Sequence, residues 1–205
     1  MGSTMRIFVT GLVLAMGMIG LAHAEGDPKA GQTKSAVCAA CHGADGNSAV
    51  PNFPKLAGQG ERYLIKQIHD IKSGNRAVPE MAGLTDNLSD QDIADIAAYF
   101  ASQPATVGSA SEATLDKGES LYRAGNAAKG IPACSGCHSP NGSGNFPAGF
   151  PRLSGQHADY VAKQLQNFRS GDRSNDGETR IMRDIAANMS DAEIKALANY
   201  ILGLH

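Results

Sequence analysis

The sequence predicts an all-α protein that consists of two tandem copies of one small domain. Blocks of sequence recur in the same order in both halves of the 205-residue chain. Apolar residues in several segments follow helical spacing, and no segment shows the sustained apolar–polar alternation of a strand. We place the first domain at residues 25–103, a linker at 104–113 and the second domain at 114–205.

Three short blocks carry the internal repeat. They pair residues 38–43 (CAACHG) with 134–139 (CSGCHS), 52–59 (NFPKLAGQ) with 149–156 (GFPRLSGQ), and 88–90 (LSD) with 189–191 (MSD). Blocks that keep their order but differ slightly in spacing are typical of a duplicated domain whose loops have changed length.

Each domain is expected to contain three helices. They are residues 28–37, 61–73 and 90–102 in the first domain and 115–124, 158–170 and 191–202 in the second. The last helix of each domain has a clear start, because Ser89 with Asp92 and Ser190 with Glu193 fit the capping-box pattern. The segment between the domains is rich in Ser, Ala, Gly and Pro, as a linker is.

The first 24 residues are expected to be a secretory signal peptide. They carry Arg6, then an apolar run over residues 7–21, and they end in Ala-His-Ala, which predicts cleavage after Ala24. The alternative is a retained transmembrane anchor, but the run is shorter than the roughly 20 residues that span a bilayer. The secreted chain would be soluble.

The charge of the chain is close to balanced. Residues 25–105 hold 7 basic and 10 acidic side chains, and residues 106–205 hold 10 of each. A nucleic-acid-binding protein would need a basic face, so we expect no nucleic-acid partner. The first half is the more acidic end and would face a basic redox partner.

Two C-x-x-C-H motifs contain all four cysteines of the chain. Their residues are Cys38, Cys41 and His42, and Cys134, Cys137 and His138. In such a motif the two thiols bind a haem covalently and the adjacent histidine reaches the iron, which predicts two c-type haems. Two disulfides, a four-cysteine zinc site and a thioredoxin-like redox pair are the alternatives. The zinc site would leave both histidines unexplained, and the redox pair would need a βαβ setting.

A methionine in each half is the candidate for the second axial ligand of the iron. Six-coordinate electron-transfer haems use Met or a second His in that position. The secreted chain has only Met81, Met182 and Met189. Met81 aligns with Met182 in the repeat, whereas Met189 aligns with Leu88 just before the helix cap. We therefore expect Met81 and Met182 to bind iron and Met189 to pack in the core.

These features together resemble the cytochrome c4 family of periplasmic diheme cytochromes. The resemblance rests on the paired C-x-x-C-H motifs, the Pro-x-Leu-x-Gly after each motif, and a methionine before each last helix. It implies two class I cytochrome c folds, each wrapped around one haem with His/Met iron. It also implies that the carbonyls of Pro54 and Pro151 accept hydrogen bonds from the axial histidine rings, which would orient these rings.

The same resemblance implies a function and a place in the cell. The protein would be a periplasmic electron carrier that takes electrons from a quinol-oxidising complex or another cytochrome and passes them towards a terminal oxidase. Peripheral association with the membrane would fit this role. One departure concerns the first half, in which six residues separate Gly74 from Met81, whereas ten separate Gly171 from Met182.

We expect a carrier and not an enzyme, because two protein ligands on each iron leave no position for a substrate. The competing hypotheses are a diheme peroxidase with one open iron, and an electron-transfer subunit of a larger oxidoreductase complex.

Overall fold

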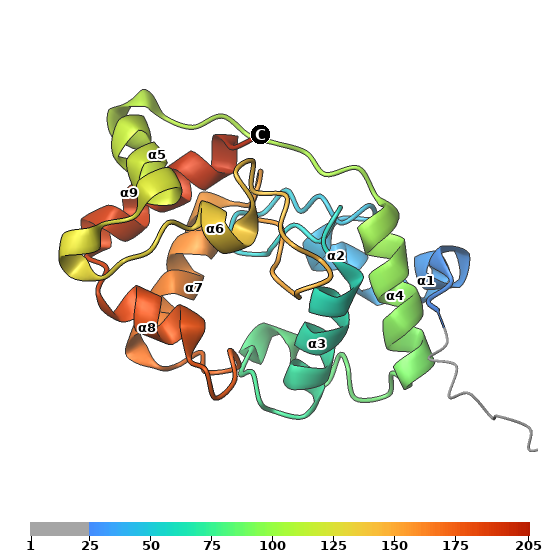
Figure 1. The fold of residues 1–205 in the computed structure, drawn as a ribbon. Helices are drawn as coiled ribbons and strands as arrows, with labels where there is room; N and C mark the ends of the chain where they lie inside the picture. Colours follow the sequence, from blue (N-terminus) through green and yellow to red (C-terminus); the bar gives the residue numbers. More distant parts are fainter. Residues whose placement is uncertain (1–24) are drawn as a thin grey trace, which may run out of the picture.

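The structure is a computed structural model that describes residues 25–205, so the predicted signal peptide lies outside the described residues. The two halves lie side by side, with the first half in blue to green and the second in yellow to red (Figure 1). Residues 25–205 form helices and turns, with two isolated β-bridges and no strand among them. The all-α prediction is confirmed.

The predicted helices are present in both halves. The first half contains α1 (Pro28–Lys34), η1 (Ser35–Val37), α2 (Ala39–His42), α3 (Glu61–Lys72), η2 (Pro79–Met81) and α4 (Asp90–Ser102). The second contains η3 (Glu112–Thr114), α5 (Leu115–Ala124), η4 (Ala127–Lys129), α6 (Ser135–His138), α7 (Ala158–Ser170), α8 (Ile181–Ala187) and α9 (Asp191–Gly203). The short helices α2, α6 and α8 were not predicted, because an element of one or two turns shows no apolar period.

In each half the first helix crosses the last helix at close range. Gly31 of α1 faces α4, and a Cβ atom placed there would lie 1.9 Å from the carbonyl oxygen of Asp95. Gly118 of α5 faces α9, and its Cβ atom would lie 2.3 Å from the carbonyl oxygen of Ala196. Only glycine leaves room for this approach of two helix backbones. The same crossing therefore organises both domains.

Both capping boxes form as predicted. The backbone N–H groups of Ser89 and Ser190 each donate to the carboxylate three residues later, at 2.9 Å, and each serine hydroxyl accepts from that residue's N–H. The same two carboxylates each pair with a lysine, which ends α1 in the first half and η4 in the second. Lys34 lies 2.7 Å from Asp92, and Lys129 lies 2.7 Å from Glu193.

The two halves are joined by hydrogen bonds that repeat almost symmetrically. The side chain of Gln59 bonds the backbone N–H and carbonyl of Arg152 at 2.7 and 3.0 Å. The side chain of Gln156 bonds the same two groups of Lys55, both at 2.9 Å. Gln59 and Gln156 are matching positions of the repeat, as are Lys55 and Arg152. The interface is therefore close to an isologous twofold contact within one chain.

The segment predicted as the linker is bonded to both halves. The backbone N–H of Thr106 donates to Asn47 of the first half at 2.9 Å. Asn199 of α9 makes two bonds of 2.8 Å with the backbone of Ser111. The linker thus fixes the spacing between the halves along one edge of the molecule.

Candidate haem centres

One large cavity runs between the two halves and collects every residue predicted to bind a haem. Its volume is about 830 Å³, near the upper end of the roughly 300–1,000 Å³ that small-molecule sites span. The predicted residues that line it are Cys38, Cys41, His42, Pro54 and Met81 from the first half, and Cys134, Cys137, His138, Pro151 and Met182 from the second.

The two histidine rings are held in the same way. Nδ1 of His42 lies 2.9 Å from the carbonyl oxygen of Pro54, and Nδ1 of His138 lies 2.9 Å from that of Pro151. A carbonyl can only accept, so Nδ1 carries the proton. Burial lowers the pKa of both rings against the opposing effect of these bonds. Each neutral ring therefore presents the lone pair of Nε2, which is the atom that a metal needs.

In each motif the second cysteine stands on a one-turn helix, α2 or α6, that ends in the histidine, and the first cysteine is the N-cap residue of that helix. In each motif the histidine N–H donates to the carbonyl of the first cysteine at 2.9 Å, so the turn brings both thiols and the ring together. All four thiols are free. Burial raises the pKa of Cys134 to about 11 and also raises that of Cys38. These are not the acidic thiols of a thioredoxin-like pair.

The zinc alternative finds no support in the part of the chain that the structure describes. No group of three or more His, Cys, Asp or Glu side chains within residues 25–205 is arranged to hold a metal ion. The two cysteine pairs belong to separate halves, each beside its own histidine. The donors instead form two sets of two thiols, one neutral imidazole and one thioether around an apolar cavity, which fits two c-type haems.

The two candidate methionine ligands stand on different local structures. Met81 lies on η2, a single 3-10 turn, and Met182 lies on the longer α8. Both side chains are half-buried and line the cavity. Met189 also touches the cavity wall, but it is only 4% exposed and belongs to the core of the second half. Its place directly before the Ser190 cap is that of a packing residue.

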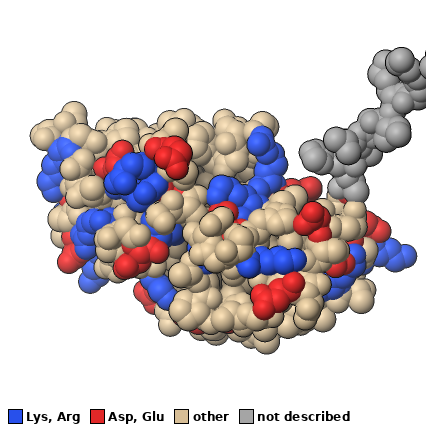
Figure 2. Space-filling view, turned by 90° about the horizontal axis from the view of Figure 1, so that it is seen from below, with Lys and Arg blue, Asp and Glu red and all other residues tan. Residues whose placement is uncertain are grey.

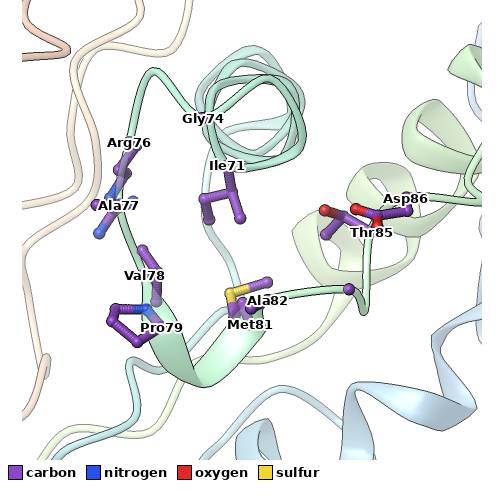
Figure 3. A pocket seen from close by; sticks show the side chains of 11 residues that line it. Ile71, Gly74, Arg76, Ala77, Val78, Pro79, Met81, Ala82, Thr85 and Asp86 are labelled. Atoms are coloured by element: carbon purple, nitrogen blue, oxygen red, sulfur yellow. The ribbon is translucent and has the colours of Figure 1, made fainter.

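A smaller cavity of about 280 Å³ lies beside Met81 (Figure 3). It is lined by the end of α3 at Ile71 and by the chain from Arg76 to Asp86. In the second half, Asp176 and Arg183 form an ion pair of 2.6 Å across the corresponding chain segment, and both side chains are largely buried. The chain around Met81 has less internal support than the chain around Met182.

One group of residues at this site is absent from the sequence predictions. Arg76 and Arg173 lie at the interface of the halves, where they bond Tyr63, Gln67, Tyr160 and Gln164. Each of the six has its partner in the repeat. These polar residues recur in both halves, although they neither cap a helix nor belong to a haem motif. That recurrence is the sequence feature that could have pointed to a shared interface.

The fold and the paired haem motifs define a c-type cytochrome with two haem-binding domains. A family model described as Cytochrome c matches residues 28–104 and again residues 115–205. The chain is 63% identical over 201 residues to cytochrome c4 of Pseudomonas aeruginosa, covering 98% of this chain and 100% of the relative. The crystal structure of reduced recombinant cytochrome c4 from Pseudomonas stutzeri superposes with a TM-score of 0.87 at 60% identity, covering 88% of this chain and 100% of that one.

A more distant relative is named as the electron acceptor of a dehydrogenase. The chain is 41% identical over 167 residues to a protein of Stutzerimonas stutzeri named thiosulfate dehydrogenase electron acceptor, covering 80% of this chain and 76% of the relative.

The chain belongs to the cytochrome c4 family. It carries two covalently attached c-type haems, one in each domain, and it transfers electrons with redox partners.

Proposed function

We propose that this protein is a periplasmic electron carrier of a respiratory chain. It takes electrons from a quinol-oxidising complex or another cytochrome and passes them towards a terminal oxidase. The observation that carries the proposal is that each half contributes both a histidine and a methionine to the haem cavity. A histidine and a methionine would hold each iron and would leave no place on it for a substrate, so the chain would act as a carrier and not as an enzyme.

The proposed ligands are His42 and Met81 in the first domain and His138 and Met182 in the second. The bonds that the ring Nδ1–H groups donate to the carbonyls of Pro54 and Pro151 orient the two rings and increase the donor strength of Nε2. Each bound haem supplies an iron that exchanges one electron. The protein contributes neutral donors and an apolar surrounding, which favour the less charged ferrous state and therefore a fairly high potential.

We propose that the chain is secreted into the periplasm. We propose cleavage after Ala24 and domains at residues 25–103 and 114–205, joined by the linker 104–113. Among the helices of residues 25–205, none combines the length and the apolar character that crossing a bilayer requires. Peripheral association with the membrane would bring the carrier near its partners. The mass of the purified protein tests the cleavage site, because it should equal the chain from Glu25 plus two haems.

Docking to the redox partners is expected to be brief and steered by charge. Acidic and basic side chains are interspersed on the face shown in Figure 2. No large field of one sign covers that face, so steering would depend on the modest acidic excess of the first half. Association with a basic partner should then slow as ionic strength rises, and a rate independent of salt would contradict this.

Optical spectra of the purified holoprotein test the carrier proposal directly. Two c-type haems per chain, neither binding carbon monoxide in the reduced state, are the expected result. Met81→Ala and Met182→Ala should each open one iron to carbon monoxide, whereas Met189→Ala should open none. A wild-type haem that binds carbon monoxide readily would favour the diheme peroxidase hypothesis instead.

The second candidate function is an electron acceptor or subunit of a sulfur-oxidising dehydrogenase. It is favoured by the similarity to the thiosulfate dehydrogenase electron acceptor. Mixing the oxidised protein with thiosulfate and a thiosulfate dehydrogenase would separate the two proposals. Fast reduction would support the second, and purification of the chain within a larger complex would favour a fixed subunit.

A further inference from the structure

Two buried arginines lie between the halves at matching positions of the repeat. Arg76 is 8% exposed and Arg173 is 7% exposed, and both line the large cavity. Each stands two residues after the glycine that follows α3 or α7. A buried guanidinium carries a full charge, which is costly to bury unless an anion compensates it.

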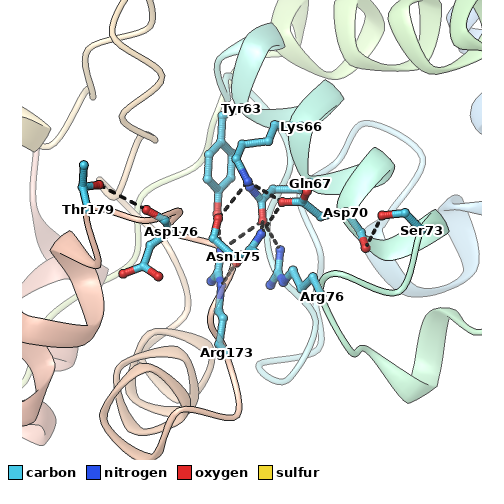
Figure 4. Close-up of polar contacts among 10 residues, drawn as sticks. All are labelled: Tyr63, Lys66, Gln67, Asp70, Ser73, Arg76, Arg173, Asn175, Asp176 and Thr179. Carbon is cyan, nitrogen blue, oxygen red and sulfur yellow. Dashed lines mark hydrogen bonds and ion pairs between the residues drawn. The ribbon is translucent and has the colours of Figure 1, made fainter.

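The two arginines are held by neutral groups, mostly across the interface, and Figure 4 shows them beside Tyr63 and Gln67 of the first half. Arg76 donates to Gln67 at 2.8 Å within its own half, and to Tyr160 and Gln164 of the other half at 3.0 and 3.2 Å. Arg173 donates to Gln164 at 2.8 Å within its half, and to Tyr63 and Gln67 of the other half at 3.2 and 3.0 Å. Both guanidinium groups thus share the oxygens of the same two amides, although like charges repel.

No carboxylate of residues 25–205 pairs with either arginine. The acidic side chains on neighbouring segments are already bonded elsewhere: Asp70 to Lys66 and Asn175, Asp176 to Arg183, and Glu80 to Lys163. Burial alone would raise the pKa of Tyr63, yet the charges of Arg173 and Arg76 lower it. The centre of the interface therefore has an excess of positive charge facing the cavity.

We propose that Arg76 and Arg173 bind propionate carboxylates of the two haems at the interface of the domains. Each haem carries two propionates, and these are the anions that this cavity receives with its cofactors. A guanidinium matches a carboxylate with parallel N–H bonds, which makes arginine suited to this task. Because each arginine is also bonded to the opposite half, the same two residues hold the cofactors and couple the two domains. This inference rests on the two haems and not on the proposed route of the electrons.

Redox titration of the holoprotein variants Arg76→Gln and Arg173→Gln tests the proposal. Removing a cation near the irons favours the ferric state. Each variant should therefore lower the reduced-to-oxidised ratio of a haem on the order of tenfold at fixed potential, or about 59 mV for one electron. Arg76→Lys and Arg173→Lys keep the charge and should restore most of the potential. Unchanged potentials in both glutamine variants would overturn the proposal.

A charge-neutral variant of the interface separates this effect from loosening of the domains. Gln156→Ala removes the two bonds to Lys55 without altering any charge. It should leave the potentials near those of the wild type, and an equal fall would show that Arg76 and Arg173 act only through domain packing. If a solution anion compensates the arginines instead, the wild-type potentials should change with chloride at constant ionic strength, which would also overturn the proposal.

Infrared spectra report the bonding of the propionate carboxylates directly, and in the wild-type holoprotein they need no variant. In the wild-type holoprotein, the carboxylate stretch of the propionates should lie at the position of arginine-bonded carboxylates. It should move towards that of free carboxylates in the glutamine variants. Propionates that already absorb as free carboxylates in the wild type would contradict the assignment.

Discussion

The two halves hold their histidines alike but support their methionines differently. Each histidine ends a one-turn helix, and Nδ1 of its ring lies 2.9 Å from a proline carbonyl oxygen. Around Met81, the chain is held mainly by backbone turns and by an exposed pair of 3.4 Å between Glu80 and Lys163. Around Met182, the helix α8 and the largely buried pair of Asp176 with Arg183 support the proposed ligand.

This difference indicates which part of a duplicated domain is free to change. The thiols and the histidine must keep one geometry for haem attachment, so both copies keep it. The proposed methionine ligand only has to reach the iron, and the chain segments that carry Met81 and Met182 differ in length. The comparison predicts that Met81 is the more easily displaced ligand, because its segment has fewer side-chain bonds to break.

The helix crossing shared by both halves should give the largest effect. Gly31→Ala and Gly118→Ala should each lower the free energy of unfolding by about 3 kcal/mol or more, since the new Cβ atom meets a backbone carbonyl that cannot move alone. Denaturant unfolding of the holoprotein measures this. Gly136→Ala is the matched control, because its Cβ atom would meet nothing within 4 Å. An effect in only one half would show that the two crossings are not equivalent.

Removing the ion pair near Met182 should make the second half resemble the first. Asp176→Asn should destabilise this segment by about 2 kcal/mol, since Asp176 accepts bonds from the side chain and the N–H of Arg183. Carbon monoxide should then bind the second reduced haem at least tenfold more tightly. If binding appears at the first haem instead, the proposed difference between the methionine segments is wrong.

Acid should weaken the second half through Glu193. Its bonds to Lys129 and Ser190 lower its pKa from 4.5 to about 2 in the folded protein. The stability that these bonds contribute is therefore present above about pH 4.5 and is lost as the pH falls to about 2. Glu193→Gln should cost about 1 kcal/mol at pH 7 and flatten this dependence. Asp92→Asn, at the more exposed counterpart, should cost less, and denaturant unfolding between pH 2 and 7 compares the two.

The exposed pair near Met81 should matter least. Within the described residues 25–205, the segment 76–86 makes one ion pair, and Glu80→Gln removes it. Exposed pairs contribute little, so unfolding free energy and carbon monoxide binding should change by no more than about 0.5 kcal/mol. A large effect would mean that this pair supports Met81 as strongly as Asp176 supports Met182.

The parts of the fold that follow a repeated local pattern could be predicted from the sequence. The capping boxes at Ser89 and Ser190 located the starts of the last helices to the residue, and the alignment of Met189 with Leu88 placed Met189 in the core, where the structure has it. The helix α8 could not be predicted. It has no copy in the first half, and it begins after Arg180, whose backbone is left-handed with φ of 49°. Its support from Asp176 depends on tertiary structure.

The arginine pair escaped prediction for a different reason. Arg76 and Arg173 recur at matching positions of the repeat, but nothing in the local sequence distinguishes a buried cation from an exposed one. The two arginines are buried because two copies of the same surface meet at the interface. The positions of Gln67 and Gln164 on matching helices allow each arginine to bond both amides only after the domains have met.

The reciprocal bonding of Gln59 and Gln156 has a consequence for the origin of the chain. Symmetric homodimers associate through a surface that binds its own copy. A single domain with the surface around Gln59 could therefore pair with a second copy and bring two haems together. Joining two such domains in one chain would replace a concentration-dependent association by a permanent one. Positions away from the contact would then be free to differ between the copies, as the segments around Met81 and Met182 do.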